Sequence, residues 1–233
     1  MIIIKFSLYF PPIFYMLNES SVYLKQRRNF MIIESLINAV IQIILFSVIP
    51  FCWWLMVGRK KCSFFAWLGF HKPIVENKTN YWAWFLIILA LLVIPINTII
   101  YFFVDASLLA SNRFSGLGFS AIVPALLYAI LQTGLSEELF FRGFLAKRFM
   151  AHFGLNKGNL LQSLLFGAIH GLMFWSSIQL IGVVLIFIAT AMAGYFMCWM
   201  NERVSNGSII SSWGIHSSAN LLVSLMAMFQ ISI

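Results

Sequence analysis

Long apolar runs separated by short polar segments make up most of this 233-residue chain. A helix of about 20 apolar residues crosses a bilayer core of roughly 30 Å. Runs of at least that length, without a charged residue, cover residues 35–57, 79–104 and 114–136. Residues 158–201 contain no Asp, Glu, Lys or Arg and are long enough for two spans, with a break at residues 175–179. A last run covers residues 204–233.

These runs predict helices, because they lack the alternation of strands and because lipid forces each segment to satisfy its own backbone hydrogen bonds. We expect an all-α, polytopic transmembrane bundle of about six spans. Residues 31–233 form one membrane domain in this interpretation, without internal repeats. Residues 1–30 are expected to be an interfacial or extension segment, since Pro11 and Pro12 interrupt their apolar stretch and no small-residue cleavage site follows it.

Composition excludes a soluble globule. Apolar residues make up 61% of the chain, charged residues 9%, and the mean hydropathy is +0.92. The net charge of +8 does not indicate a nucleic-acid partner, because the basic residues lie in the connecting segments. We therefore expect the lipid bilayer as the main surrounding and no nucleic acid. The three cysteines form no CxxC pair and suggest no chemistry.

The basic residues predict the orientation of the spans. Nine of them lie in the first, third and fifth connections, and five lie before the first span or in the second connection. Lys and Arg are enriched in cytoplasmic loops, so the odd-numbered connections are expected in the cytoplasm. The cluster of Lys25, Arg27 and Arg28 opposes this orientation, and a start at Met31 would remove it.

Three ionisable side chains follow the uncharged stretch 114–136 directly: Glu137, Glu138 and Arg142. Ionisable groups at membrane depth cost several kcal/mol and are rare, so they indicate a functional site by default. Glu138 and Arg142 are four residues apart with the acid first, which favours an intrahelical ion pair. That pairing leaves Glu137, about 100° away around the helix, as the candidate general base.

Two histidines in later apolar runs lie at a similar depth. Counted from the nearest basic residue at about 1.5 Å per residue, Glu137, His170 and His216 all lie roughly 14 to 20 Å from the expected cytoplasmic boundary. Three separate spans thus bring polar groups to one layer, nearer the cytoplasmic side. The sequence alone does not determine which faces of these spans meet.

The neighbours of the histidines add to this cluster. His216 and Asn220 are four residues apart and share a helix face, where they can bind a metal or donate hydrogen bonds to an oxyanion. Gly167 and Gly171 flank His170 in a GxxxG pattern, which predicts close approach of another helix.

Three motifs on successive apolar runs carry a family resemblance. Residues 137–142 match EExxxR, Phe166 with His170 matches FxxxH, and His216 with Asn220 matches HxxxN. In this order they resemble the CPBP family of intramembrane proteases, also called the Abi or CAAX-protease-like family. The resemblance covers residues 118–233, the expected catalytic core.

The resemblance implies an endopeptidase that cleaves peptide bonds within or beside the membrane. By motif position, Glu137 is implied to activate water with the help of His170. His216 and Asn220 are implied to stabilise the oxyanion of the tetrahedral intermediate.

The same resemblance leaves the cofactor open. Glu138 and Arg142 are implied to hold the helix and tune the site. In a metalloprotease interpretation, Glu137, His170 and His216 hold Zn²⁺, which would lower the pKa of a bound water to about 7. A metal-free glutamate mechanism is the other reading, and the sequence has no HExxH pair that would require zinc.

Substrate and cellular setting follow from the resemblance only as classes. The expected substrate is a membrane-associated or prenylated, CAAX-like protein, or a bacteriocin-type peptide, and the expected location is the bacterial cytoplasmic membrane. One alternative is a catalytically silent membrane protein for bacteriocin self-immunity or scaffolding. A proton-coupled transporter is less favoured, because the chain shows no paired broken helices in two related halves.

Overall fold

The computed structural model describes residues 21–231, with side-chain detail from residue 26 onward. Every regular element in this range is helical, in agreement with the predicted all-α class. The expected segment 1–30 lies mostly outside the described residues. From Ser21 onward the chain forms the first helix, which continues past residue 30 without a break.

Two long helices open the described chain. Helix α1 covers Ser21–Val57, a short α2 covers Phe64–Trp67, and α3 covers Lys78–Phe103. Asn77 begins α3, because its side-chain oxygen accepts a hydrogen bond from the Asn80 amide at 3.0 Å.

Short 3₁₀ turns connect α3 to the next long segment; they are η1 (Ala106–Leu108), η2 (Ala110–Phe114) and η3 (Gly118–Ala121). One continuous helical segment follows and changes its winding along its length. It consists of α4 (Ile122–Leu126), η4 (Leu127–Leu135), α5 (Ser136–Glu138), η5 (Leu139–Ala146) and α6 (Lys147–Phe153). The elements η4 and η5 are π-helical.

Three further helices complete the fold. They are α7 (Leu155–Met173), α8 (Leu180–Trp199), which continues as the π-helical η6 (Met200–Val204), and α9 (Ile210–Phe229). The predicted break at residues 175–179 is confirmed, since α7 ends at Met173 and α8 begins at Leu180.

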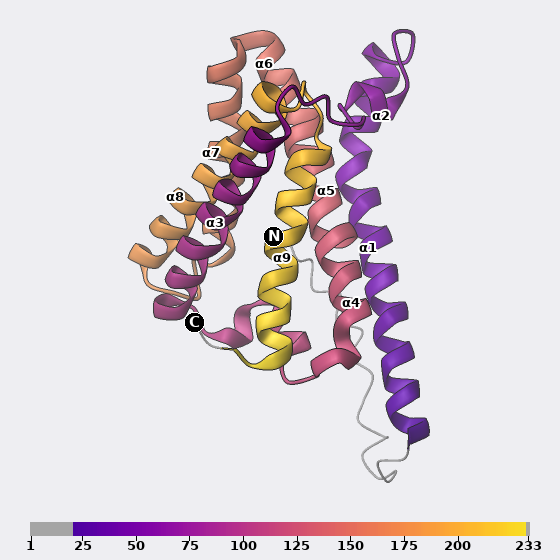
Figure 1. Ribbon diagram of the computed structural model, residues 1–233, viewed down its shortest axis with the longest axis vertical. Helices are drawn as coiled ribbons and strands as arrows, with labels where there is room; N and C mark the ends of the chain where they lie inside the picture. Colours follow the sequence, from indigo (N-terminus) through magenta and orange to yellow (C-terminus); the bar gives the residue numbers. More distant parts are fainter. Residues whose placement is uncertain (1–20, 232–233) are drawn as a thin grey trace.

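Helix α9 lies in the middle of the bundle (Figure 1). It packs against α3 on one side and against η4 on the other, while α1 covers the outer face of η4. Helices α7 and α8 form an antiparallel pair on the side away from α1, and α8 packs on α3. The segment containing Glu137 is therefore enclosed by neighbours rather than exposed to lipid.

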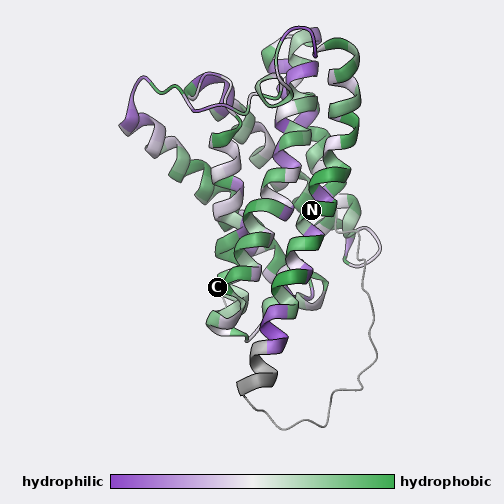
Figure 2. Cartoon of the chain, turned by 90° about the vertical axis from the view of Figure 1, so that its right-hand side faces the viewer, coloured by the Kyte–Doolittle hydropathy of each residue, from purple (hydrophilic) through white to green (hydrophobic). Residues whose placement is uncertain are grey.

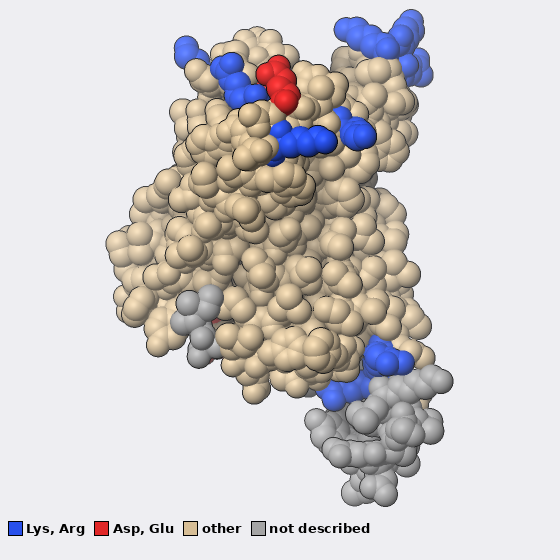
Figure 3. All heavy atoms as spheres, in the orientation of Figure 1, with Lys and Arg blue, Asp and Glu red and all other residues tan. Residues whose placement is uncertain are grey.

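The surface has the pattern of an integral membrane protein. Hydrophobic residues cover the length of the helices and hydrophilic ones gather toward the two ends (Figure 2). Lys and Arg likewise lie at the two ends and leave an uncharged waist in the visible face (Figure 3). Which end faces the cytoplasm stays a prediction.

Within residues 21–231, four helical segments are long and apolar enough to cross a membrane; they are Gln26–Val57, Lys78–Phe103, Gly118–Phe153 and Leu180–Val204. The count of six is not confirmed, because α7 and α9 are not among them. Both carry polar side chains that the bundle buries, such as Gln162 on α7 and Ser212 on α9. These side chains lower the hydropathy of the two helices.

The predicted third span needs a correction. Residues 114–117 precede the helix, which runs from Gly118 to Phe153, so Glu137 lies near the middle of the segment and not at its end. The charges do not end the helix, because Glu138 and Arg142 pair with each other inside it at 3.0 Å.

The GxxxG prediction is confirmed, and α8 is the helix that approaches. A Cβ atom on Gly167 would lie 2.6 Å from the Phe187 carbonyl oxygen and 2.7 Å from the Ala191 Cβ. On Gly171 the nearest atoms would lie at 3.3 Å. Gly167 therefore sets how closely α7 and α8 can pack.

We expect Gly167→Ala to destabilise the protein by about 1–3 kcal/mol through overpacking against the α8 backbone. Gly171→Ala is the matched control, in which the helix-propensity gain of about 1 kcal/mol offsets milder crowding. Thermal unfolding of the detergent-solubilised variants measures both. Equal unfolding midpoints for the two variants would contradict this account of the helix pair.

Candidate active site

The two glutamates lie in a helix of unusual winding. The three residues of α5 stand between two π-helical segments, η4 and η5. π-Helical turns are rare and occur frequently at functional sites. As consecutive residues of the helix, Glu137 and Glu138 face different neighbours, and both are buried, with exposed fractions of 1% and 0%.

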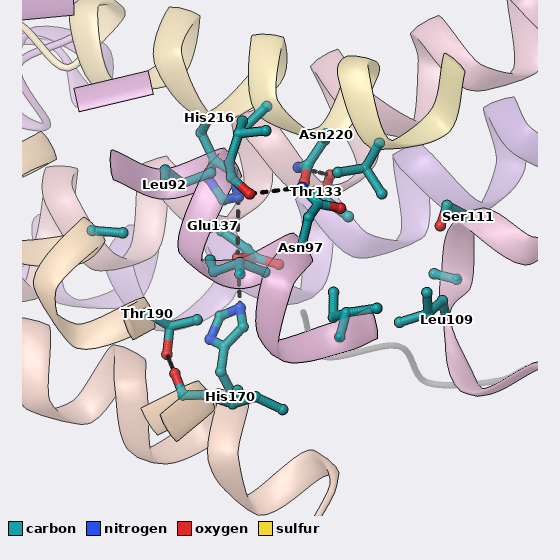
Figure 4. Close-up of a pocket in the computed structure, with 18 of the residues that line it drawn as sticks. Leu92, Asn97, Leu109, Ser111, Thr133, Glu137, His170, Thr190, His216 and Asn220 are labelled. Atoms are coloured by element: carbon teal, nitrogen blue, oxygen red, sulfur yellow. Dashed lines mark hydrogen bonds and ion pairs between the residues drawn. The ribbon is translucent and has the colours of Figure 1, made fainter. Parts of the chain in front are cut away.

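A close contact brings α9 to this segment. A Cβ on Gly134 would lie 2.5 Å from the Ala129 carbonyl oxygen and 2.5 Å from the Ser217 hydroxyl, so glycine suits both the winding of η4 and the observed approach of α9. The approach sets His216 and Asn220 of α9 opposite Glu137 and Thr133 (Figure 4).

Glu137 lies between the two histidines (Figure 4). Its Oε2 atom is 4.0 Å from Nε2 of His170 and 3.9 Å from Nε2 of His216. Three elements, α5, α7 and α9, thus bring one carboxylate and two imidazoles together. The common depth seen in the sequence corresponds to actual proximity in space.

Hydrogen bonds at the other ring nitrogens orient both imidazoles. His170 Nδ1 lies 2.8 Å from the Phe166 carbonyl oxygen, which can only accept, so Nδ1 carries the proton. His216 Nδ1 lies 3.0 Å from Oε1 of Glu138 and donates to this carboxylate. In the neutral rings, both Nε2 lone pairs therefore face Glu137.

Glu138 is the centre of a second polar cluster. Its carboxylate pairs with Arg142 at 3.0 Å, contacts His216 and accepts a hydrogen bond from the Ser212 hydroxyl. Asn201 holds Ser212 in turn, since its Nδ2 donates to Ser212 Oγ at 2.8 Å and its Oδ1 accepts from the Ser212 amide at 3.0 Å. The predicted ion pair is present, and it belongs to a larger network than the sequence indicated.

The structure gives Glu137 neighbours of its own beside the ion pair. Glu137 faces His170 and His216, and His216 lies between both carboxylates. Two carboxylates against one guanidinium leave one negative charge in the cluster when both acids are ionised. Because an uncompensated buried charge is costly, this cluster depends on the polar side chains that surround both carboxylates.

Arg142 is buried, with an exposed fraction of 1%. Its guanidinium carbon lies 4.2 Å from the centre of the Phe166 ring, a cation–π contact that supports the charge. Phe166 also lies 4.3 Å, centre to centre, from the His170 ring. Phe166 thus connects the cluster around Arg142 to His170.

A cavity of about 140 Å³ begins at Glu137. It extends toward the connection at residues 104–117, because its walls come from the second half of α3, the middle of α8 and the η2 region. Most of the walls are apolar, including Leu92, Ile96, Ile100 and Ile186. Its polar side chains are Asn97, Ser111, Tyr128, Thr133, Glu137, His170, Thr190, His216 and Asn220.

Zinc would need closer ligands than this arrangement offers. Ligand atoms lie about 2.0–2.2 Å from zinc, so two ligands of one tetrahedral ion are about 3.3–3.6 Å apart. The separations of 3.9 and 4.0 Å from Glu137 to the histidines are larger. Among residues 21–231, no group of three His, Cys, Asp or Glu side chains is placed to share a metal ion. The three side chains do not fit zinc as they stand.

Comparison with known proteins adds a family to this geometry. A family model described as type II CAAX prenyl endopeptidase Rce1-like matches residues 119–222, which contain the EExxxR, FxxxH and HxxxN motifs. The match supports the CAAX-protease-like family for residues 119–222, in agreement with the resemblance that the three motifs carry. No curated protein and no solved structure matched the chain.

The CAAX-protease-like family is a family of proteases, so the match supports a CAAX-type peptidase within the membrane at the level of the family. The motif residues lie at or beside the cavity: Glu137, Phe166, His170, His216 and Asn220 line it, and the Glu138–Arg142 pair belongs to the same helical segment as Glu137.

Some polar residues at the site were not identified from the sequence. Ser212, Asn201 and Thr133 belong to no motif, and small polar residues are common inside membrane bundles. Their spacing gave one signal, because Thr133 precedes Glu137 by four residues and Ser212 precedes His216 by four. Their other partners lie on separate elements, so only the structure reveals those contacts.

We expect Arg142→Met to destabilise the protein by about 3–5 kcal/mol, because it leaves the buried Glu138 carboxylate without its cation. The double variant Glu138→Gln with Arg142→Met removes both charges and should recover part of this loss. Thermal unfolding in detergent of the two single variants and the double variant tests the coupling. Strictly additive losses would show that the two side chains do not stabilise each other.

Proposed function

We propose that this protein is an intramembrane endopeptidase in which Glu137 activates a water molecule for attack on a peptide bond. The observation that supports this most is the position of one buried carboxylate within 4.0 Å of two imidazole Nε2 atoms at the end of a cavity. The family of residues 119–222 supports the reaction class.

The separations suit a water molecule held between the side chains. Direct hydrogen bonds join atoms at about 2.7–3.2 Å, so the carboxylate and the two imidazoles are too far apart to bond well to each other. One water at about 2.8 Å from both atoms can bridge a gap of 3.9 or 4.0 Å. Glu137 and neutral His170 both accept hydrogen bonds, so they orient its two protons.

The first step forms a carbon–oxygen bond. Glu137 removes one proton from the water as its oxygen attacks the carbonyl carbon of the substrate, and the carbonyl oxygen becomes an oxyanion. His216 in its protonated form donates from Nε2 to this oxyanion, and the Asn220 amide donates a second hydrogen bond. Glu138 supports the imidazolium from Nδ1 at 3.0 Å.

The second step breaks the carbon–nitrogen bond. The tetrahedral intermediate collapses, and protonated Glu137 returns its proton to the leaving amine, which restores the carboxylate. Arg142 stays paired with Glu138 throughout, so the cluster behind His216 keeps its charge. Both proposed steps use only water and the side chains of the site.

The cavity walls favour an apolar substrate. Side chains from α3 and α8 would contact the hydrophobic part of a membrane-associated peptide or a lipid-modified, CAAX-like protein. A bacteriocin-type precursor peptide is the other substrate class in this proposal. We place the reaction in the cytoplasmic membrane of a bacterium, with the active site nearer the cytoplasmic side.

We expect Glu137→Gln to reduce the cleavage rate by about 10²–10⁴-fold, because the amide cannot take the proton from water. The assay uses the protein in liposomes with quenched fluorescent peptides, farnesylated and unmodified. Mass spectrometry of new peptide termini in membranes of expressing cells covers other substrates. Glu34→Gln, the same change at an exposed position of α1, is the control.

The proposed peptidase activity would be refuted if Glu137→Gln cleaved peptides at the wild-type rate. It would also be refuted if no new peptide terminus in the membranes depended on Glu137. Undiminished bacteriocin immunity in cells carrying the Glu137→Gln variant would instead favour the catalytically silent alternative.

We expect removal of metal ions with 1,10-phenanthroline followed by dialysis to leave the cleavage rate unchanged, since the ligand atoms are too far apart for zinc. Elemental analysis of the purified protein accompanies the assay. One zinc ion per chain, with activity lost on chelation and restored by added zinc, would overturn the metal-free mechanism.

A further inference from the structure

We infer that Thr133 is a positioning residue that fixes the side-chain amide of Asn220 with its nitrogen toward the reacting groups. The inference rests on the proposed function, in which Asn220 donates to the oxyanion. Thr133 belongs to none of the three motifs. It lies in η4, four residues before Glu137, and its exposed fraction is 0%.

The hydroxyl group of Thr133 has two partners. Its oxygen lies 3.0 Å from the Tyr128 carbonyl oxygen and 2.7 Å from Nδ2 of Asn220. A carbonyl oxygen can only accept a hydrogen bond, so the single hydroxyl proton goes to Tyr128. The Thr133 oxygen can then only accept from Asn220.

This arrangement determines which way the Asn220 amide points. The amide has a nitrogen that donates and an oxygen that accepts, and a rotation of 180° exchanges them. If the amide turned, its oxygen would face the Thr133 oxygen, whose proton is already committed to Tyr128. Two acceptors would meet without a proton, which is unfavourable in a buried site.

The fixed amide leaves one donor for the cavity. One of the two N–H groups of Asn220 bonds to Thr133, and the other stays available to the cavity that Asn220 lines together with Glu137 and His216. Figure 4 shows Thr133 and Asn220 side by side, next to these two residues. The direction of the second N–H thus depends on the Thr133 hydroxyl.

The π-helical winding of η4 makes the double contact feasible. The Thr133 side chain bonds to a carbonyl five residues earlier, which is the spacing of backbone hydrogen bonds in a π-helix. The hydroxyl is thereby tied to its own helix while it receives a bond from α9. Through this contact, a side chain of η4 orients a side chain of α9.

The test compares Thr133→Val with Thr133→Ser. Valine keeps the shape of the side chain and loses the hydroxyl, whereas serine keeps the hydroxyl. For Thr133→Val we expect kcat to fall by about 10- to 100-fold at an unchanged KM. A misdirected donor reduces the stabilisation of the transition state but not the binding of the substrate. Thr133→Ser should retain a kcat near the wild-type value.

A double-mutant comparison separates positioning from general packing. In an Asn220→Ala background, Thr133→Val should cause no further fall in kcat, because the amide that it orients is gone. Unfolding midpoints of all variants check the fold. If Thr133→Val does not fold, Thr133→Ala is compared with Thr133→Ser in the same way.

Three results would overturn the inference: wild-type kcat in Thr133→Val, an equally low kcat in Thr133→Ser, or additive losses with Asn220→Ala. Glu137→Gln is measured beside them. Loss of cleavage in Glu137→Gln together with full activity in Thr133→Val refutes the role of Thr133 alone, whereas activity in Glu137→Gln refutes the proposed function itself.

Discussion

Burial of the Glu138 carboxylate is the constraint on which the rest of the structure depends. A carboxylate inside a membrane bundle is tolerated only with compensating partners, and Glu138 has three of them: Arg142, His216 and Ser212. Arg142 lies on the same helical segment, whereas the other two come from α9. The network therefore ties the segment Gly118–Phe153 to α9 and fixes their register.

Glu137 acquires its surroundings as a consequence of this tie. His216 is held at Nδ1 by Glu138, so its Nε2 atom faces Glu137, and the same approach of α9 brings Asn220 to Thr133. The small residue Gly134 permits that approach. On the other side, close packing of α7 and α8 supports the helix that carries His170. Packing and chemistry thus use the same contacts, which is why variants at this site need controls for folding.

The apolar cavity gives the polar cluster its setting. Its walls come from elements far apart in the chain, and they hold the carboxylate and the imidazoles away from bulk water. In such surroundings hydrogen bonds and charges act more strongly than in water. The connection at residues 104–117, which contributes to the walls, has no recognisable motif.

The sequence by itself determined the all-helical membrane class, the family of the region with the three motifs, the Glu138–Arg142 pair and the close helix contact at Gly167. Each of these depends on spacing within one segment or on composition, which are local properties. Only the tertiary structure decided that Glu137, His170 and His216 meet, that Glu138 binds His216 and Ser212, and that Thr133 holds Asn220. These contacts join side chains on different helices, and their formation depends on how each helix is rotated and wound, which no spacing along the chain encodes.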